Sequence, residues 1–253
     1  MRLQELLRLG ETNAERFRNA QPFPHIYLDN VFPQKILHGV SREFPEIKPT
    51  DALHLSSNKG CMTTGERFKC SLENSGGREG SRLMSTPYAR SLYSLLLSPD
   101  FVYFLEALTG IQGIISDNSF TGSGFDQTLP GGGLAVHTDF HFNGALKLTR
   151  RVNVFIYLNP EWKESYGGHL ELWPRNLSAC ARRILPSLGR LAMFSSTDFS
   201  FHGHPRPLRP PPGRMRRSLA LYYYTPGPRP PGECEDGDCE TFRNADWQSI
   251  AMD

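Results

Sequence analysis

The stretch Leu134-Ala135-Val136-His137-Thr138-Asp139 decides how the rest of this sequence is interpreted. Its first three residues predict a strand, and residues i and i+2 of a strand point to the same face. His137 and Asp139 would therefore converge, one with an imidazole nitrogen and the other with a carboxylate oxygen. A His-x-Asp pair alone is more often a surface turn. With one further histidine from a neighbouring strand, however, it would form the two-histidine, one-carboxylate set that holds a non-haem ferrous ion.

The pattern around this stretch predicts a mainly β fold with N-terminal helices. Helices are expected at 2–18, after Pro33, and from the Thr86-Pro87 and Ser98-Pro99 starts to a stop at Gly110. An extended segment is expected at 22–28, and the polar segment 50–85 is expected to form loops with short structure. Candidate strands are 114–121, 123–128, 133–138, 152–158, 168–173, 190–195, 198–202 and 216–224. Eight short strands without intervening helices favour a jelly roll, or double-stranded β-helix, packed on the helices.

Length and composition favour one domain without a nucleic-acid or membrane partner. The 253 residues are expected to form a single domain over 1–225, with helical support at 1–112 and a β core at 113–225. A tail rich in Pro, Gly and acidic residues follows at 226–253. The net charge of +2 gives no electrostatic reason for binding nucleic acid or lipid, and no apolar run is long enough to cross a bilayer.

The cysteines favour a reducing compartment. There are five, an odd number, and no secretory leader opens the sequence, so we expect a cytoplasmic protein. Cys234 and Cys239 flank an acidic turn and could form a weak metal clip. The sequence favours instead two free thiols in a mobile tail.

Four histidines after Asp139 could supply the third metal ligand: His141, His169, His202 and His204. His141 continues the alternation of the first pair, but three alternate positions on one strand span about 13 Å at ~3.3 Å per residue, too far to meet at one ion. His169 begins a strand whose alternate residues are apolar, which places it on the other face. His202 ends an apolar strand and is favoured, whereas His204 is expected to lie in a turn.

The segment 216–222 offers a possible binding site for an organic acid. It begins with Arg216, fourteen residues after His202. Strand alternation places Arg216 and Ser218 on one face and Arg217 on the other. A buried guanidinium with a hydroxyl two residues later suits a carboxylate, because it offers a two-pronged donor. The competing interpretation is a solvated basic cluster that grips nothing, formed by Arg206, Arg209, Arg214, Arg216 and Arg217.

Taken in order, these motifs resemble the 2-oxoglutarate and Fe(II)-dependent dioxygenases of the prolyl 4-hydroxylase type. The resemblance is close over 120–225 and extends loosely to Pro22–Asn30. Its motifs are His137-x-Asp139, Arg151-Val-Asn-Val-Phe-Ile-Tyr157-Leu-Asn159-Pro-Glu-Trp162, Gly167-Gly168-His-Leu-Glu-Leu-Trp173-Pro, Gly189-Arg-Leu-Ala-Met-Phe194, Phe201-His202-Gly203 and Arg216-Arg-Ser218-Leu-Ala-Leu-Tyr222. Each motif alone is weak evidence for this family, but the whole set in this order is specific to it.

The resemblance implies a ferrous ion held by His137, Asp139 and His202, and 2-oxoglutarate bound through Arg216 with support from Ser218 and Tyr157. It further implies O2 as a substrate, release of succinate and CO2, hydroxylation of a C–H bond, and ascorbate as an accessory reductant. No acid or base beyond the metal centre is needed. Because the basic residue is doubled at Arg216-Arg217, the strand register decides which arginine binds the co-substrate.

The substrate and two other functional classes stay open at this stage. A prolyl residue in a peptide, a free amino acid and a small natural product all suit the motifs, with a slight preference for a prolyl or peptidyl substrate by fold resemblance. Glycine-rich segments at 122–124 and 131–133, the stretch 141–149 and the loop 205–214 are expected to border the pocket. The alternatives are a catalytically silent β-barrel binding module and a cupin-like metal-dependent hydrolase or isomerase that recruits His141.

Overall fold

The computed structural model describes residues 3–44, 61–64, 67–73, 83, 85–117, 123–235, 239 and 247–248. Its helices are α1 (Leu3–Arg18), α2 (Gln34–Glu43), α5 (Pro87–Leu96) and α6 (Pro99–Thr109), with 3-10 turns at Glu164–Tyr166 and Pro231–Glu233. Its strands are β1 (His25–Leu28), β2 (Cys61–Thr64), β3 (Arg67–Glu73), β4 (Ile115–Ser116), β5 (Gly124–Thr128), β6 (Leu134–His137), β7 (Phe142–Asn143), β8 (Leu148–Tyr157), β9 (Leu170–Trp173), β10 (Arg182–Ile184), β11 (Leu191–Ser195), β12 (Phe201–His204), β13 (Arg216–Thr225) and β14 (Trp247–Gln248).

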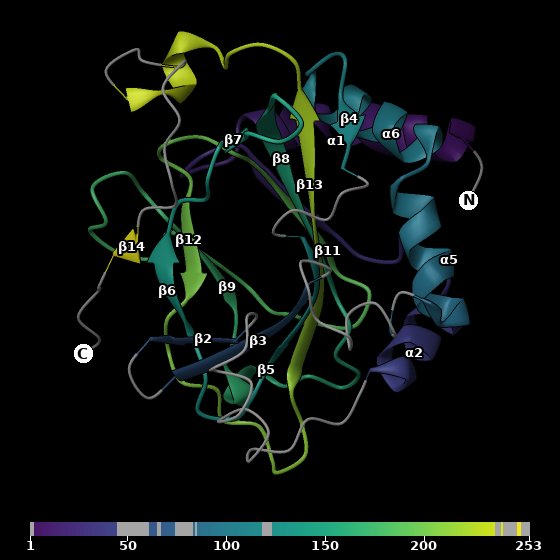
Figure 1. Cartoon of the computed structure of the whole chain (residues 1–253), viewed down its shortest axis with the longest axis vertical. Helices are drawn as coiled ribbons and strands as arrows, with labels where there is room; N and C mark the ends of the chain where they lie inside the picture. The colour runs from purple at the N-terminus through teal and green to yellow at the C-terminus, as the bar shows by residue number, and fades with distance from the viewer. Residues whose placement is uncertain are drawn as a thin grey trace.

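The strands form two antiparallel sheets that face each other (Figure 1). The major sheet has the order β1-β11-β8-β13-β5-β3-β2, with β4 paired to β13 and β7 to β8. The minor sheet has the order β10-β9-β12-β6-β14. Neighbours in both sheets are largely distant in sequence, as in a jelly roll, so the predicted fold class is confirmed.

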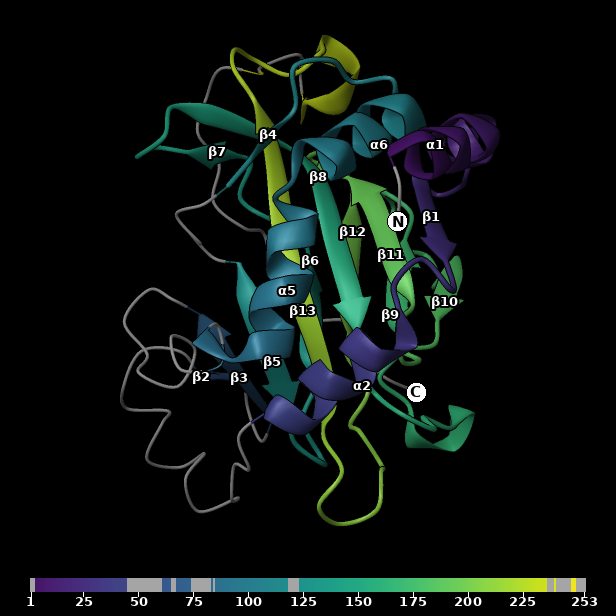
Figure 2. The same ribbon diagram turned by 90° about the vertical axis from the view of Figure 1, so that its right-hand side faces the viewer.

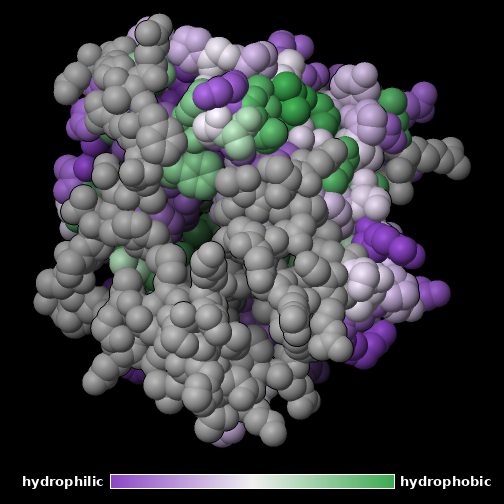
Figure 3. All heavy atoms as spheres, in the orientation of Figure 1, coloured by the Kyte–Doolittle hydropathy of each residue, from purple (hydrophilic) through white to green (hydrophobic). Residues whose placement is uncertain are grey.

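The helices cover the outer face of the major sheet, as Figure 2 shows. Their apolar sides and the sheet form one core, in which Phe101, Leu105, Val154 and Leu219 are almost fully buried. The hydroxyl of buried Tyr223 donates to the Leu96 carbonyl at 2.7 Å, joining β13 to α5. Each buried aromatic or aliphatic side chain of this size contributes about 1.5–3 kcal/mol. On the face in Figure 3, hydrophobic side chains gather near the top, and hydrophilic ones line the helical side.

A second, smaller core lies between the two sheets. It contains Tyr157, Leu170, Leu172, Ala192 and Phe194. Leu170 and Leu172 alternate along β9, so their neighbour Glu171 points to the outer face of the minor sheet. Apolar side chains therefore line part of the space between the two sheets.

The predicted helix starts differ in how they are capped. The Ser98 hydroxyl accepts from the Phe101 amide at 3.3 Å, and α6 ends at Gly110, both as expected. Thr86 does not cap α5 with its side chain. The Glu43 carboxylate does so instead, accepting from the amides of Tyr88 at 3.0 Å and Ala89 at 2.8 Å and from the Thr86 hydroxyl at 2.6 Å. A carboxylate at a helix N-terminus also interacts favourably with the helix dipole.

Several predicted strand boundaries were wrong. The strand expected at 198–202 begins later, at Phe201, and is β12. The residues before it form a turn, in which the Thr197 amide donates to the Ser200 hydroxyl at 2.9 Å. His204 therefore lies in a strand, and the turn expected for it is not found. Three short strands, β7, β10 and β14, were not predicted. Part of the strand expected at 114–121 and most of the segment 50–85 lie outside the described residues.

The C-terminal tail is attached to the barrel over 226–235. Arg229 pairs with Asp198, and the Asp198 carboxylate also accepts from the Glu235 amide at 2.8 Å. Cys234 and Cys239 form a disulfide, so the expectation of two free thiols in a mobile tail was wrong. Their Cα atoms are 5.3 Å apart, within the usual range for a disulfide. None of the helices in the described ranges is both long and apolar enough to traverse a lipid bilayer.

Candidate metal centre

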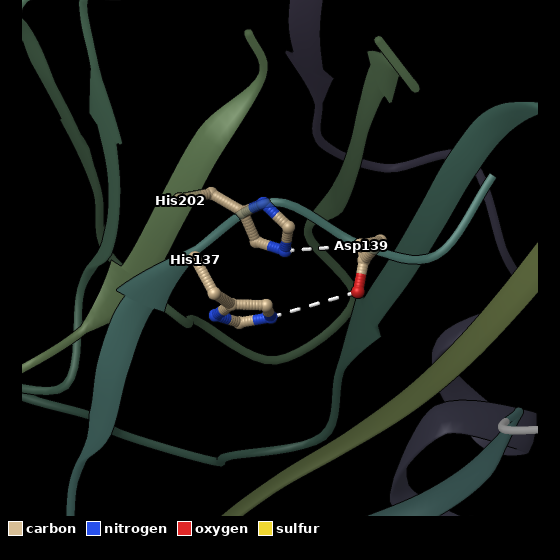
Figure 4. Close-up of side chains that lie close together, drawn as sticks. All are labelled: His137, Asp139 and His202. Carbon is tan, nitrogen blue, oxygen red and sulfur yellow. Dashed lines mark ion pairs between the residues drawn. The ribbon is translucent and has the colours of Figure 1, made fainter. Parts of the chain in front are cut away.

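Three side chains from two distant segments meet inside the barrel (Figure 4). The ligand atoms of His137, Asp139 and His202 all lie within 4.8 Å of one another. The His137 Nε2 is 3.5 Å from Asp139 Oδ1, and the His202 Nε2 is 3.3 Å from Asp139 Oδ2. The pairing of β6 with β12 places His137 directly opposite His202. No other such group of potential metal ligands is found among the described residues.

A bulge at Gly203 supports this pairing. The register shifts between His202 and His204, which pair with His137 and Leu134 of β6. A Cβ atom at Gly203 would lie 2.8 Å from the Ala135 carbonyl oxygen and 2.9 Å from that of Leu134. Because both neighbours are backbone atoms that cannot rotate away, only glycine allows β12 to approach β6 this closely.

The two imidazole rings are oriented by backbone carbonyls. The Nδ1 of His137 is 2.9 Å from the Ala135 carbonyl oxygen, and the Nδ1 of His202 is 3.0 Å from that of Ser200. A carbonyl oxygen can only accept, so Nδ1 carries the proton in each ring and Nε2 keeps its lone pair. Burial lowers the pKa of His202 to about 3, which keeps that ring neutral. Two imidazoles that present their Nε2 atoms to one point suit a divalent metal.

Asp139 is held ionised by its neighbours. Burial alone would raise the pKa of its carboxyl group, but the charge of Arg150 and the contacts with His202 and His137 hold that pKa well below its usual value. Arg150 donates to Asp139 Oδ2 at 2.8 Å, and the Asn153 amide donates to the same oxygen at 2.8 Å. The site therefore presents one carboxylate and two neutral imidazoles, a set that fits Fe(II) with further positions open.

Arg150 and Asn153 were not predicted as part of the site. Strand alternation from Tyr157 would place Arg151, not Arg150, on the inner face. In the structure β13 skips Arg151: Tyr223 pairs with Val152, and Tyr224 pairs with Arg150. This bulge reverses the alternation, so Arg150 turns inward and Arg151 turns toward Glu233, 3.1 Å away. Asn153, in contrast, could have been found from the sequence. It lies four residues before Tyr157, so strand alternation places both side chains on the inner face.

The candidate co-substrate residues lie together on the inner face of the major sheet. Arg216 pairs with Thr128 of β5, and Ser218 pairs with Tyr157 of β8. Arg216 is buried, and its Nε donates to the Gly168 carbonyl at 2.7 Å. Gly168 has a φ of +71°, and a Cβ there would lie 2.9 Å from Arg216 Cδ, so this close approach requires glycine.

The surroundings of Arg216 fit a carboxylate group. The Tyr157 hydroxyl and the Thr128 hydroxyl are buried without a hydrogen-bond partner in the described structure. Burial raises the pKa of Tyr157 despite the nearby Arg216, so its hydroxyl stays protonated and can donate. Buried polar groups are rarely left unpaired, so the two hydroxyls and the guanidinium suit a ligand with several acceptor oxygens. Thr128 was not singled out from the sequence.

Arg217 faces the opposite side of the sheet, as alternation predicts. Its Nε donates to Gln127 at 3.0 Å and its Nη1 donates to the Ser41 carbonyl at 2.8 Å, which ties β13 to α2. Arg216 and Arg217 are therefore not part of a solvated cluster, whereas Arg206 and Arg209 are exposed to solvent. Arg206 lies 3.3 Å from Glu171, and Arg214 donates to the Pro160 carbonyl at 3.0 Å.

The other three candidate ligands, His141, His169 and His204, are buried but are not part of the metal cluster. His141 Nδ1 lies 3.6 Å from Asp198 Oδ1, and His169 Nε2 lies 2.6 Å from Glu164 Oε2. His204 borders a cavity of about 170 Å³ together with His169 and the loop residues Arg206, Pro207 and Arg209. The loop 205–214, which was expected to border the substrate pocket, therefore lines this cavity. His137, Asp139 and His202 do not border it.

The chain matches a known protein family over its β core. Residues 124–224 match the model of the 2OG-Fe(II) oxygenase superfamily. The matched segment contains every candidate site residue named above. No curated protein matches the sequence.

Several solved structures share the fold. A prolyl 4-hydroxylase from Phytophthora capsici is 18% identical, with 88% of this chain and 65% of that chain covered and a TM-score of 0.53. A prolyl-4-hydroxylase from Pseudomonas putida is 16% identical, with 89% and 100% covered and a TM-score of 0.50. A Trichoplax adhaerens prolyl hydroxylase, solved with a hypoxia inducible factor peptide, is 18% identical, with 88% and 91% covered and a TM-score of 0.49.

Proposed function

We propose, from the premise that this chain is a prolyl 4-hydroxylase-like 2OG-Fe(II) oxygenase, that it hydroxylates a C–H bond with Fe(II), 2-oxoglutarate and O2. In this proposal His137, Asp139 and His202 hold the ferrous ion. Arg216, with Ser218 and Tyr157, binds the co-substrate. The bound metal and co-substrate supply the oxidising chemistry, with succinate and CO2 as the by-products.

One observation carries the proposal: two imidazoles and one carboxylate within 4.8 Å share the barrel interior with a buried arginine. Arg216 lies beside two buried hydroxyls that have no hydrogen-bond partner in the described structure. A metal site alone would not need this second group. A carboxylate-binding group beside the metal cluster suits a reaction in which a diacid binds at the ion.

The residues of this chain contribute binding, orientation and exclusion of water. The backbone carbonyls of Ala135 and Ser200 keep the two imidazoles in the tautomer that can bind a metal. Arg216 orients the diacid by a charge-assisted contact at a buried position, where such contacts are stronger than in water. The proposed reaction requires no protein acid or base at the reacting carbon.

We propose a prolyl or peptidyl substrate. Two of the solved structures that share this fold at a TM-score of 0.50 or above are prolyl 4-hydroxylases. That support is an analogy of fold, and the identity of the substrate is a question for the assay below. A hydrolase that recruits His141 is disfavoured, because that ring lies against Asp198 and is not part of the metal cluster.

The first test is anaerobic addition of Fe(II) and then 2-oxoglutarate to the purified chain. Chelation of the ion by the diacid is expected to give a weak visible charge-transfer band. A protein that binds zinc normally and gives no such band would contradict the proposal and favour a hydrolase. A protein that binds neither would favour a silent binding module.

The second test is substrate-stimulated succinate formation, with and without ascorbate. We expect prolyl peptides to raise the rate above that of free amino acids and sugars. Stimulation by a small molecule alone, with no response to any prolyl peptide, would retain the oxygenase and overturn the peptidyl substrate.

A further inference from the structure

The cavity of about 170 Å³ on the outer face of the minor sheet is lined by charged side chains that the proposed function does not use. Its walls include His169 and Glu171, which point away from the core between the sheets because they alternate with Leu170 and Leu172. No residue of the metal cluster borders it. The cavity is therefore a separate place in the molecule.

Glu171 is the buried negative charge of this cavity. Its exposed fraction is 2%. One carboxylate oxygen, Oε1, lies 3.3 Å from Arg206 Nη1 and 3.5 Å from Arg183 Nε. The other oxygen, Oε2, is buried and has no hydrogen-bond partner among the described residues. Buried acceptors are rarely left unpaired, so Oε2 suits the N–H group of a ligand.

Glu164 adds a second carboxylate to the walls of the cavity. Its Oε2 is 2.6 Å from His169 Nε2, and Arg183 Nη2 is 3.3 Å from His169 Nδ1. An arginine can only donate, so His169 Nδ1 accepts and Nε2 carries the proton that points to Glu164. Burial lowers the pKa of His169, so its ring is neutral at neutral pH. This contact therefore leaves the negative charge of Glu164 uncancelled.

Arg209 provides a positive charge at the same cavity. Its backbone amide donates to the Tyr166 carbonyl at 2.9 Å, and the amide of buried Leu208 donates to the Gly132 carbonyl at 3.0 Å. Its side chain is exposed, and its guanidinium makes no hydrogen bond or ion pair with any described residue. The loop therefore fixes the backbone of Arg209 beside the cavity and leaves its charge available to a ligand.

The size of the cavity limits the ligand to a few non-hydrogen atoms. One water molecule occupies about 30 Å³ in the liquid, so about 170 Å³ has room for roughly five waters or one equally small molecule. Pockets for drug-sized ligands are larger, about 300–1,000 Å³. A ligand that uses both Glu171 and Arg209 in this space must carry a cationic N–H donor and an anionic acceptor close together.

We propose that this cavity binds a small free α-amino acid, such as glycine, alanine or serine, with its ammonium group on Glu171 and its carboxylate on Arg209. A purely anionic ligand would bring its charge against Glu171 and Glu164, and a simple amine would leave Arg209 unused. The inference goes beyond the proposed function, because no residue of the metal cluster takes part. Gly168, whose carbonyl accepts from Arg216, also borders the cavity, so the site adjoins the candidate co-substrate arginine.

The test is calorimetric titration of the metal-free protein with L-alanine. Acetate and ethylamine, which carry the carboxylate and the ammonium group separately, are titrated in parallel. We expect L-alanine to bind roughly 10-fold or more tightly than either, because one molecule makes both charged contacts. Glu171→Gln and Arg209→Met should each weaken L-alanine binding by roughly 10-fold to 100-fold, since each removes hydrogen bonding between charged groups. Arg209→Met alters an exposed side chain, so it keeps the inference testable if Glu171→Gln does not fold.

Arg214→Met is the matched control. Arg214 lies in the same loop as Arg209, but it donates to the Pro160 carbonyl at 3.0 Å and does not border the cavity. This variant should bind L-alanine as the wild type does. The wild-type protein loaded with Fe(II) and 2-oxoglutarate should also bind L-alanine with the affinity of the metal-free protein, because the two sites share no ligand-binding group.

Three outcomes would overturn the inference. Absence of saturable binding of glycine, L-alanine and L-serine would show that the cavity is not an amino-acid site. Acetate binding as tightly as L-alanine would show a site for anions alone. Loss of L-alanine binding on loading with Fe(II) and 2-oxoglutarate would place the amino acid at the metal cluster. A protein that binds L-alanine as expected but gives no charge-transfer band would instead contradict the proposed function and leave this inference standing.

Discussion

Replacing Arg216 by methionine should weaken 2-oxoglutarate binding far more than the same change at Arg217. Methionine keeps the apolar stem and removes the guanidinium. Arg216 is buried on the inner face of β13, beside Thr128 and the Gly168 carbonyl. Arg217 is on the outer face and binds Gln127 and Ser41. The two variants therefore remove the same group from opposite sides of one strand.

The magnitude follows from the contacts that a guanidinium makes to a carboxylate. Hydrogen bonds to a charged group contribute roughly 1.5–3 kcal/mol each. If each of the two bonds contributes about 1.5–2 kcal/mol, in the lower part of that range, the total loss is about 3–4 kcal/mol. At ~1.4 kcal/mol for each tenfold change, the dissociation constant should rise by roughly 100-fold to 1,000-fold. The Gly168 carbonyl loses its donor in both the free and the bound protein, so that loss cancels in the difference.

The assay is an anaerobic titration of the Fe(II)-loaded protein with 2-oxoglutarate, followed by the charge-transfer band or by calorimetry. Arg217→Met should bind the diacid within about threefold of wild type. Arg216→Lys should restore part of the affinity, because it keeps the charge but not the two-pronged geometry. A larger effect at Arg217 than at Arg216 would refute the assigned register of β13 and with it the co-substrate site.

Three further predictions concern the metal site and the fold. His202→Ala should abolish metal retention after dialysis while His204→Ala keeps it, and the reverse result would move the third ligand by two residues. Glu43→Ala should lower the free energy of unfolding by about 1–2 kcal/mol in urea denaturation, because α5 loses its cap; an unchanged value would show that Thr86 caps the helix unaided. In the metal-free protein, burial lowers the pKa of His202 to about 3 while the unfolded ring titrates near 6.5. Between these pH values only the unfolded state binds the proton, so stability should fall by up to about 1.4 kcal/mol per pH unit on acidification. His202→Gln should remove that slope, and a slope that persists would assign it to other groups.

The pattern of residues along single strands was predictable from the sequence. The two-residue spacing of His137 and Asp139 and the alternation of Arg216 and Arg217 follow from the period of an extended chain. Strand spacing also argued against His141 as a metal ligand, and in the structure its ring lies 3.6 Å from Asp198. The ordered motifs then predicted the jelly roll that the two sheets form.

The contacts between strands were not predictable in the same way. Arg150 joins the site because β13 skips Arg151, and His202 faces His137 because β12 pairs with β6. The cap of α5 comes from Glu43, at the end of another helix. Asp198 binds Arg229 and the Glu235 amide and so attaches the tail to the barrel. Each of these depends on a partner segment that lies far away along the chain.

The sequence by itself therefore determined which side chains share a face wherever a strand has no bulge, and it supplied His137, Asp139 and His202 as candidate metal ligands. Only the tertiary structure decided that Arg150 and Asn153 hold the second oxygen of Asp139 and that Thr128 lies beside Arg216. The physical reason is that a bulge inserts one unpaired residue and turns every residue beyond it to the other face. Its position is set by the hydrogen bonds of the partner strand, which local residue periodicity does not contain.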